Sequence, residues 1–152
     1  MDDEVIPTLY QPMPDFQREF LEKRRLEHLQ TYPEFAQLER RLLSIGGEMV
    51  VPRREPDHDK ILSRGKLWVR DNIKIVTIGR TPSNCHGNVA KIWRHNPERY
   101  HIATGWALTE DGLWRQHSWI IDGRIVIETT MLREKYFGFV LTPLEAQQFE
   151  AT

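Results

Sequence analysis

From residue 66 onward, apolar and polar residues alternate over short runs that are separated by turn residues. Such alternation, rich in β-branched and aromatic residues, is typical of strands with one buried face. Because short turns join neighbouring runs, we expect four to five strands in an antiparallel sheet. The runs predict strands over residues 67–69, 73–78, 102–108, 113–121, 124–129 and 136–141.

Ahead of these runs, the apolar spacing changes to that of helices. Residues 15–31 contain strong helix formers, and Asp15 is the predicted N-cap. A second helix opens at Pro33 and stops at Gly46-Gly47, because proline suits the first helical turn and glycine the position after the last. Its apolar stripe consists of Phe35, Leu38, Leu42 and Ile45.

The predicted fold class is α+β: an N-terminal helical pair, then a central helix carrying the cysteine, packed on the sheet. We expect residues 1–58 to form an N-terminal arm and helical segment, and residues 59–152 to form an α+β core, together one compact unit. Local signals also predict an extended arm over 1–14, a loop over 48–58, a short helix over 59–63, a helix from near Cys85 to near Asn96, and a helix-like tail opened by Thr142-Pro143.

Cys85 is the one cysteine of the chain. The preceding Thr81-Pro82-Ser83-Asn84 is a helix-start signal, which places Cys85 within about one turn of a helix N-terminus. Unpaired N–H groups and the helix dipole favour a thiolate there and lower a thiol pKa from its ordinary ~8.5. At about 100° per residue, Cys85 shares a face with Val89, Ile92 and Trp93, which directs the thiol toward the core.

The sequence Asp122-Gly123 is typical of a two-residue hairpin turn, with apolar residues on both sides. If these two residues are the turn, Ile121 lies opposite Arg124, Trp119 opposite Val126, and His117 opposite Glu128. Directly opposed residues have Cβ atoms about 4.5–5.5 Å apart. The register therefore predicts a hydrogen bond between the imidazole and the carboxylate.

Composition limits the function classes. The 152 residues are 39% hydrophobic and 28% charged, with a net charge of −1, which indicates a soluble globular protein and argues against a nucleic-acid binder that relies on broad electrostatics. No apolar run approaches the ~18 residues of a membrane span. The N-terminus has no secretory h-region, so a cytoplasmic location is the default expectation.

The order of these elements resembles the papain-like superfamily of cysteine hydrolases and acyltransferases. A cysteine at a helix start, a histidine on a following strand and an acidic residue on the next strand occur in that order, and the short spacing is similar to the transglutaminase-like and NlpC/P60-like branches. The resemblance implies Cys85 as nucleophile, His117 as general base and Glu128 as its orienting residue. It also implies thioester chemistry on an amide or isopeptide of a peptide or protein substrate, without a cofactor.

One feature of that superfamily is missing here. Papain-type enzymes carry a glutamine before the cysteine as an oxyanion donor, and residues 77–80 contain none. An oxyanion hole would use the Cys85 backbone N–H and one more donor. The candidates for oxyanion or substrate contacts are Asn84, Asn88 and Gln116, with Arg115 for an anionic substrate group.

Two alternatives use the same residues differently. Cys85 is a small buried hydrophobe in the first, and the N-terminal helices bind a protein partner, so the protein is a non-enzymatic interaction module. In the second, Cys85, His86 and His117 hold a metal ion. Their spacing matches no recognisable ligand pattern, so we expect no metal site. Thiol reactivity near neutral pH separates the enzyme from the module.

Overall fold

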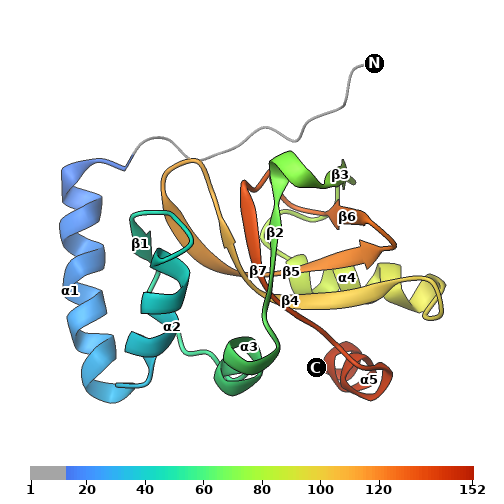
Figure 1. The fold of residues 1–152 in the computed structure, drawn as a ribbon, viewed down its shortest axis with the longest axis horizontal. Helices are drawn as coiled ribbons and strands as arrows, with labels where there is room; N and C mark the ends of the chain where they lie inside the picture. Colours follow the sequence, from blue (N-terminus) through green and yellow to red (C-terminus); the bar gives the residue numbers. More distant parts are fainter. Residues whose placement is uncertain (1–12) are drawn as a thin grey trace.

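The computed structural model describes residues 13–152, so the predicted arm lies almost wholly outside the described residues. The described part is a mixed α+β fold (Figure 1). Its elements are α1 (Asp15–Thr31), α2 (Phe35–Leu43), β1 (Met49–Val50), α3 (His58–Arg64), β2 (Lys66–Val69), the 3-10 helix η1 (Arg70–Asn72), β3 (Lys74–Thr77), α4 (Cys85–His95), β4 (His101–Leu108), β5 (Leu113–Asp122), β6 (Ile125–Glu128), β7 (Lys135–Val140) and α5 (Pro143–Ala151).

The helix predictions are confirmed within a few residues. The apolar stripe of α2 is buried as expected, and α4 ends directly before Asn96-Pro97. The N-cap of α1 is Pro14 instead of Asp15, which is the first helical residue. Thr142 caps α5 in a capping box with Glu145. Within residues 13–152, no helix is both long and apolar enough to cross a bilayer.

The sheet departs from the prediction of four to five antiparallel strands. It has seven strands in the order β2-β7-β4-β5-β6-β3, with β1 beside β5, and it is mixed because β1 pairs with β5 and β3 with β6 in parallel. The predicted loop over 48–58 contains β1, whose two residues are too few to show an alternating pattern. The meander of β4, β5 and β6 is antiparallel as predicted.

The curled sheet has a core on each face (Figure 1). Helices α2, α3, α4 and α5 contribute apolar side chains to the larger core, together with Trp106, Trp114 and Ile120 of the sheet. The smaller core is built around Trp119 and Tyr136, against which residues of β2 and β3 pack. The two ends of the sheet therefore enclose the face that the helices leave open.

One edge of β5 is only partly paired. β4 occupies the other edge from Trp114 to Ile121. The edge opposite β4 carries β1 at Leu113 and Trp114 and β6 from Ile120 to Asp122. Between them, residues 116–119 pair with no strand of the described part of the chain on this edge. This open stretch, here called the β5 window, lets a side chain from the helical side reach the backbone of β5.

The β5–β6 hairpin differs in register from the prediction. Ile121 pairs with Val126 instead of Arg124, a shift of two residues, and the terminal pair is Asp122 with Ile125. Gly123 opens the turn at φ +62°, the glycine-first arrangement of a type II′ turn. A shift of two keeps each side chain on its predicted face, because side chains alternate with period two. His117 and Glu128 thus become diagonal instead of direct neighbours.

This turn predicts a clear difference between two adjacent substitutions. Gly123→Ala should lower the free energy of unfolding by about 1–2 kcal/mol, because a Cβ disfavours the left-handed conformation. Asp122→Asn should cost less than about 1 kcal/mol, because it removes only the exposed ion pair with Arg99. Urea unfolding of both variants measures the difference. Equal losses would contradict the turn assignment.

Candidate functional site

Cys85 is the first residue of α4, as the helix-start signal predicts. Its half-buried thiol meets β5 at the window, where the His117 side chain and the backbone N–H of Ser118 can stabilise a thiolate by hydrogen bonding. Burial raises the pKa of the Cys85 thiol, but these two hydrogen bonds and the charges of His117 and Arg133 outweigh it and leave the pKa below its ordinary value. The site therefore favours a thiolate.

His117 lies in β5, and its side chain is almost wholly buried. Its Nε2 atom is 2.9 Å from Glu128 Oε1 and 3.1 Å from Oε2. A carboxylate only accepts hydrogen bonds, so Nε2 carries the proton and Nδ1 is the accepting nitrogen of the neutral ring. Burial and the Arg133 charge lower the pKa of His117, whereas the Glu128 charge and the bonds to Cys85 and Glu128 raise it, with a net increase. This arrangement suits a general base.

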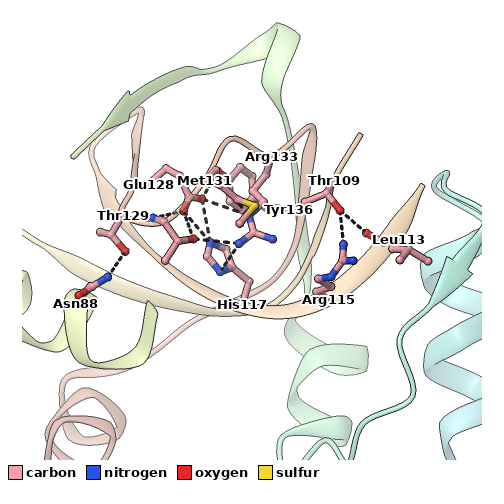
Figure 2. Close-up of polar contacts among 11 residues, drawn as sticks. Asn88, Thr109, Leu113, Arg115, His117, Glu128, Thr129, Met131, Arg133 and Tyr136 are labelled. Carbon is pink, nitrogen blue, oxygen red and sulfur yellow. Dashed lines mark hydrogen bonds and ion pairs between the residues drawn. The ribbon is translucent and has the colours of Figure 1, made fainter. Parts of the chain in front are cut away.

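Glu128 ends β6 and has no exposed surface. Besides His117, it accepts hydrogen bonds from the Tyr136 hydroxyl at 2.7 Å and from the Thr130 backbone N–H at 2.9 Å and hydroxyl at 3.0 Å (Figure 2). Burial raises the pKa of Glu128, but His117, Arg133 and the Thr130 N–H lower it to about 2. The carboxylate is thus ionised and locked in one orientation toward the imidazole.

Arg133 is a part of the site that the sequence analysis missed. It is 5% exposed, and its Nη2 lies 3.0 Å from Thr130 Oγ1 and 3.4 Å from His117 Nδ1. Its Nε donates to the Met131 carbonyl and lies 4.0 Å from Glu128 Oε1 (Figure 2). The local sequence has no strand or helix pattern at Arg133. The one sequence signal that could have indicated it is a basic residue a few positions after the candidate acid.

Aromatic rings shield the imidazole and carboxylate from water. Trp119 lies two residues after His117 on the same face of β5, with ring centroids 6.1 Å apart and planes inclined by 21°. Tyr136, two strands away in β7, lies at the same centroid distance of 6.1 Å. Both rings are fully buried. Excluding water in this way strengthens the hydrogen bond between His117 and Glu128.

A cleft of about 810 Å³ opens beside the thiol. Cys85, His117 and Arg133 lie in its wall, which is completed by the segment before α3 and by α5. This volume falls within the range of small-ligand sites, about 300–1,000 Å³. The thiol and imidazole are therefore placed where a bound group could react with them.

The other predicted contacts are distributed unevenly around the cleft. Asn84 and Gln116 line it, but the Gln116 amide already donates to Arg54 O at 2.6 Å. Asn88 is buried and donates to Thr81 O at 2.9 Å and Thr129 Oγ1 at 3.3 Å, so it fixes the start of α4 (Figure 2). Arg115 lines the cleft, but its guanidinium is held by Thr109 and Asp111.

The residues of the metal alternative are not arranged as a ligand set. His86 turns toward α5, where its ring stacks on Phe149 at 3.7 Å and Nε2 lies 2.9 Å from the Phe149 carbonyl oxygen. Across residues 13–152, no group of three or more His, Cys, Asp or Glu side chains is placed to hold a metal ion. Cys85 and His117 thus face each other without a third ligand from this set.

The geometry places Cys85 beside the hydrogen-bonded pair of His117 and Glu128 at the edge of a cleft. Arg133, Tyr136 and Thr130 complete its surroundings. Comparison with known proteins adds no relative to this description: no family model, no curated protein and no solved structure matches the chain.

Proposed function

We propose that the protein is a cysteine-dependent hydrolase or acyltransferase that acts on an amide or isopeptide through a thioester on Cys85. One observation carries this proposal: the thiol, imidazole and carboxylate are linked in sequence, with the thiol in the wall of the cleft. A nucleophile within reach of a base that a third group orients is the arrangement of covalent acyl-transfer sites.

In the proposed reaction, His117 Nδ1 takes the proton from the Cys85 thiol, and the thiolate attacks the carbonyl carbon of the substrate. The carbon–nitrogen bond then breaks as His117 returns that proton to the leaving amine, which leaves a thioester. Water or a second amine, deprotonated by His117, attacks the thioester and releases an acid or a new amide together with the free thiol. Glu128 stabilises the imidazolium that forms after the first transfer.

The resemblance to the transglutaminase-like and NlpC/P60-like branches stays part of this proposal. The nitrogen assignment supports it, because Nε2 faces the orienting acid and Nδ1, which Arg133 approaches to 3.4 Å, is the nitrogen that can act as the base. The substrate proposed on this basis is a peptide or protein amide. Hydrolysis and transfer share every step up to the thioester, so the same site serves both.

The proposal predicts a reactive thiol. Iodoacetamide should alkylate native protein at Cys85 much faster than it alkylates glutathione, and the rate should reach half its maximum at a pH well below ~8.5. An intact-mass time course across pH 5–10 gives the rate and the apparent pKa. Glutathione under the same conditions is the reference thiol. A native thiol that alkylates more slowly than glutathione at every pH would contradict the proposed function.

A second candidate function is protein binding through α1. Phe16 and Phe20 lie one helical turn apart on α1 and are 75% and 58% exposed. Exposed aromatic pairs of this kind occur at protein interaction sites. An inert thiol in the alkylation experiment would favour this function, because Cys85 would then serve only as packing.

A further inference from the structure

Glu55 is an acidic residue of the cleft that the proposed reaction does not use. It precedes α3 and lines the same cleft as Cys85. Its Oε1 accepts hydrogen bonds from the Trp106 indole N–H at 2.9 Å and the Gln116 amide at 3.2 Å, and its Oε2 accepts from the Asp57 backbone N–H at 2.9 Å. Trp106 is fully buried and Gln116 belongs to β5, so the carboxylate is held in a fixed place.

The three donors to Glu55 are all uncharged. No Lys, Arg or His side chain in residues 13–152 lies within 4.0 Å of it as an ion pair, and its neighbouring charge is the carboxylate of Asp57. Burial, together with Asp57, raises the pKa of Glu55 despite its hydrogen bonds. Glu55 is partly buried, and a carboxylate withdrawn from water gains from a cationic partner, so the absence of a described one leaves room for a cation from a bound molecule.

Three of the four Lys and Arg side chains that line the cleft have acidic neighbours of their own, and the fourth, Arg53, is exposed. Lys60 is 2.9 Å from Glu145, and Arg115 is 3.1 Å from Asp111. Arg133 is next to Glu128. Each of these three cations thus has a carboxylate within 4.0 Å, while no described cation pairs with Glu55.

We propose that Glu55 binds a cationic group of the substrate, a primary ammonium such as that of a lysine side chain, in the cleft beside Cys85. The claim that the ammonium belongs to the substrate rests on the proposed function. The claim that Glu55 binds an ammonium rests only on the contacts of Glu55. The ammonium would donate a hydrogen bond to the Glu55 carboxylate from the cleft side. It would be the first charged donor, because the described donors to Glu55 are all uncharged.

The Trp106 indole N–H reports on this site directly, because it donates to Glu55. Nα-acetyl-lysine methylamide, titrated into ¹⁵N-labelled protein at pH 7, should shift the Trp106 indole resonance saturably. The uncharged isostere Nα-acetyl-norleucine methylamide should bind at least roughly tenfold more weakly. Trp106→Phe assigns the resonance. Equal affinity for the two compounds, or no response to either, would overturn the proposal.

Two variants locate the charge. Glu55→Gln keeps an oxygen for Trp106 and Gln116 and should abolish the preference for the lysine compound. Asp57→Asn is the matched control, since it removes the neighbouring charge of the same cleft, and it should retain the preference. Loss of the preference in Asp57→Asn alone would assign the site to Asp57 and sink the role of Glu55. Thermal melting confirms that each variant is folded before titration.

Thiol labelling separates this proposal from the proposed function. Cationic 2-aminoethyl methanethiosulfonate should react with Cys85 faster, relative to neutral methyl methanethiosulfonate, in the wild type than in Glu55→Gln, by about threefold or more. A thiol inert to both reagents contradicts the enzyme function, while the Trp106 titration still decides whether Glu55 binds a cation. A reactive thiol without a Trp106 response contradicts the role of Glu55 alone.

Discussion

Replacing Cys85 by alanine should abolish thioester formation and leave the fold intact. The substitution removes the only nucleophile of the proposed reaction, so no acyl adduct should appear by intact mass after incubation with p-nitrophenyl acetate. The stability cost should be about 1 kcal/mol or less, because the half-buried thiol is a small side chain at the tip of α4. Val89, Ile92 and Asn88 hold the helix on the sheet independently of the sulfur.

Lys91→Ala is the control for this experiment, because Lys91 lies on the exposed side of the same helix. It should form the acyl adduct at the wild-type rate. If Cys85→Ala fails to fold and the native wild-type thiol resists alkylation, Cys85 is a core residue. If the folded variant still releases p-nitrophenol at the wild-type rate, the nucleophile is not Cys85. Circular dichroism and urea unfolding distinguish those two outcomes.

Glu128→Gln should reduce both activity and stability, and its loss of stability should be the largest of the single substitutions considered for the site. The amide cannot stabilise the imidazolium, so acylation should slow by a factor between tens and ~10⁴. Its loss of charge leaves Arg133, which is 5% exposed, without a neighbouring buried anion. Breaking a buried ion pair on one side costs about 3–5 kcal/mol, so the variant should keep the fold but lose about that much stability.

The pH dependence of stability gives a second readout. The pKa of Glu128 is about 2 in the folded protein and ~4.3 in an unfolded chain. Its contribution to stability is therefore complete above the unfolded value and disappears as the pH falls toward about 2. Glu128→Gln should lose this part of the acid dependence. Unfolding free energies measured by urea between pH 2 and 7 test the sign.

Tyr136→Phe is the matched control for Glu128→Gln. It removes one hydrogen bond to the carboxylate but keeps its charge, so it should cost about 1 kcal/mol and slow acylation only modestly. A variant Glu128→Gln that acylates at the wild-type rate would mean that the orienting group of His117 lies elsewhere. Equal stability losses in the two variants would contradict the role of the charge.

The proximity of His117 and Glu128 was predicted from the hairpin, although the predicted register is shifted by two residues. The turn signal of Asp122-Gly123 marks a hairpin but does not decide which residue opens it. The alternation of side chains is insensitive to a shift of two, so both groups remain on one face. Diagonal neighbours about 7–8 Å apart at Cα are within reach of long side chains such as glutamate.

The sequence by itself determined the elements and the chemistry-bearing residues that local signals mark. Pro82 and its polar neighbours start the helix at Cys85, and period-two alternation defines β4, β5 and β7. These signals act over a few residues, within the range where backbone preferences and side-chain periodicity are expressed. The α+β class follows from their order.

Only the tertiary structure decided how these elements form a site. The β5 window exists because β1 and β6 pair with different parts of one edge of β5. β1 is a two-residue strand that lies more than 60 positions before His117 in the sequence. Arg133 reaches the site from the segment before β7, Tyr136 from β7 itself, and Glu55 from the segment before α3. Contacts between such distant segments depend on the packing of the whole sheet. This packing produces no periodic pattern in the sequence around the contacting residues.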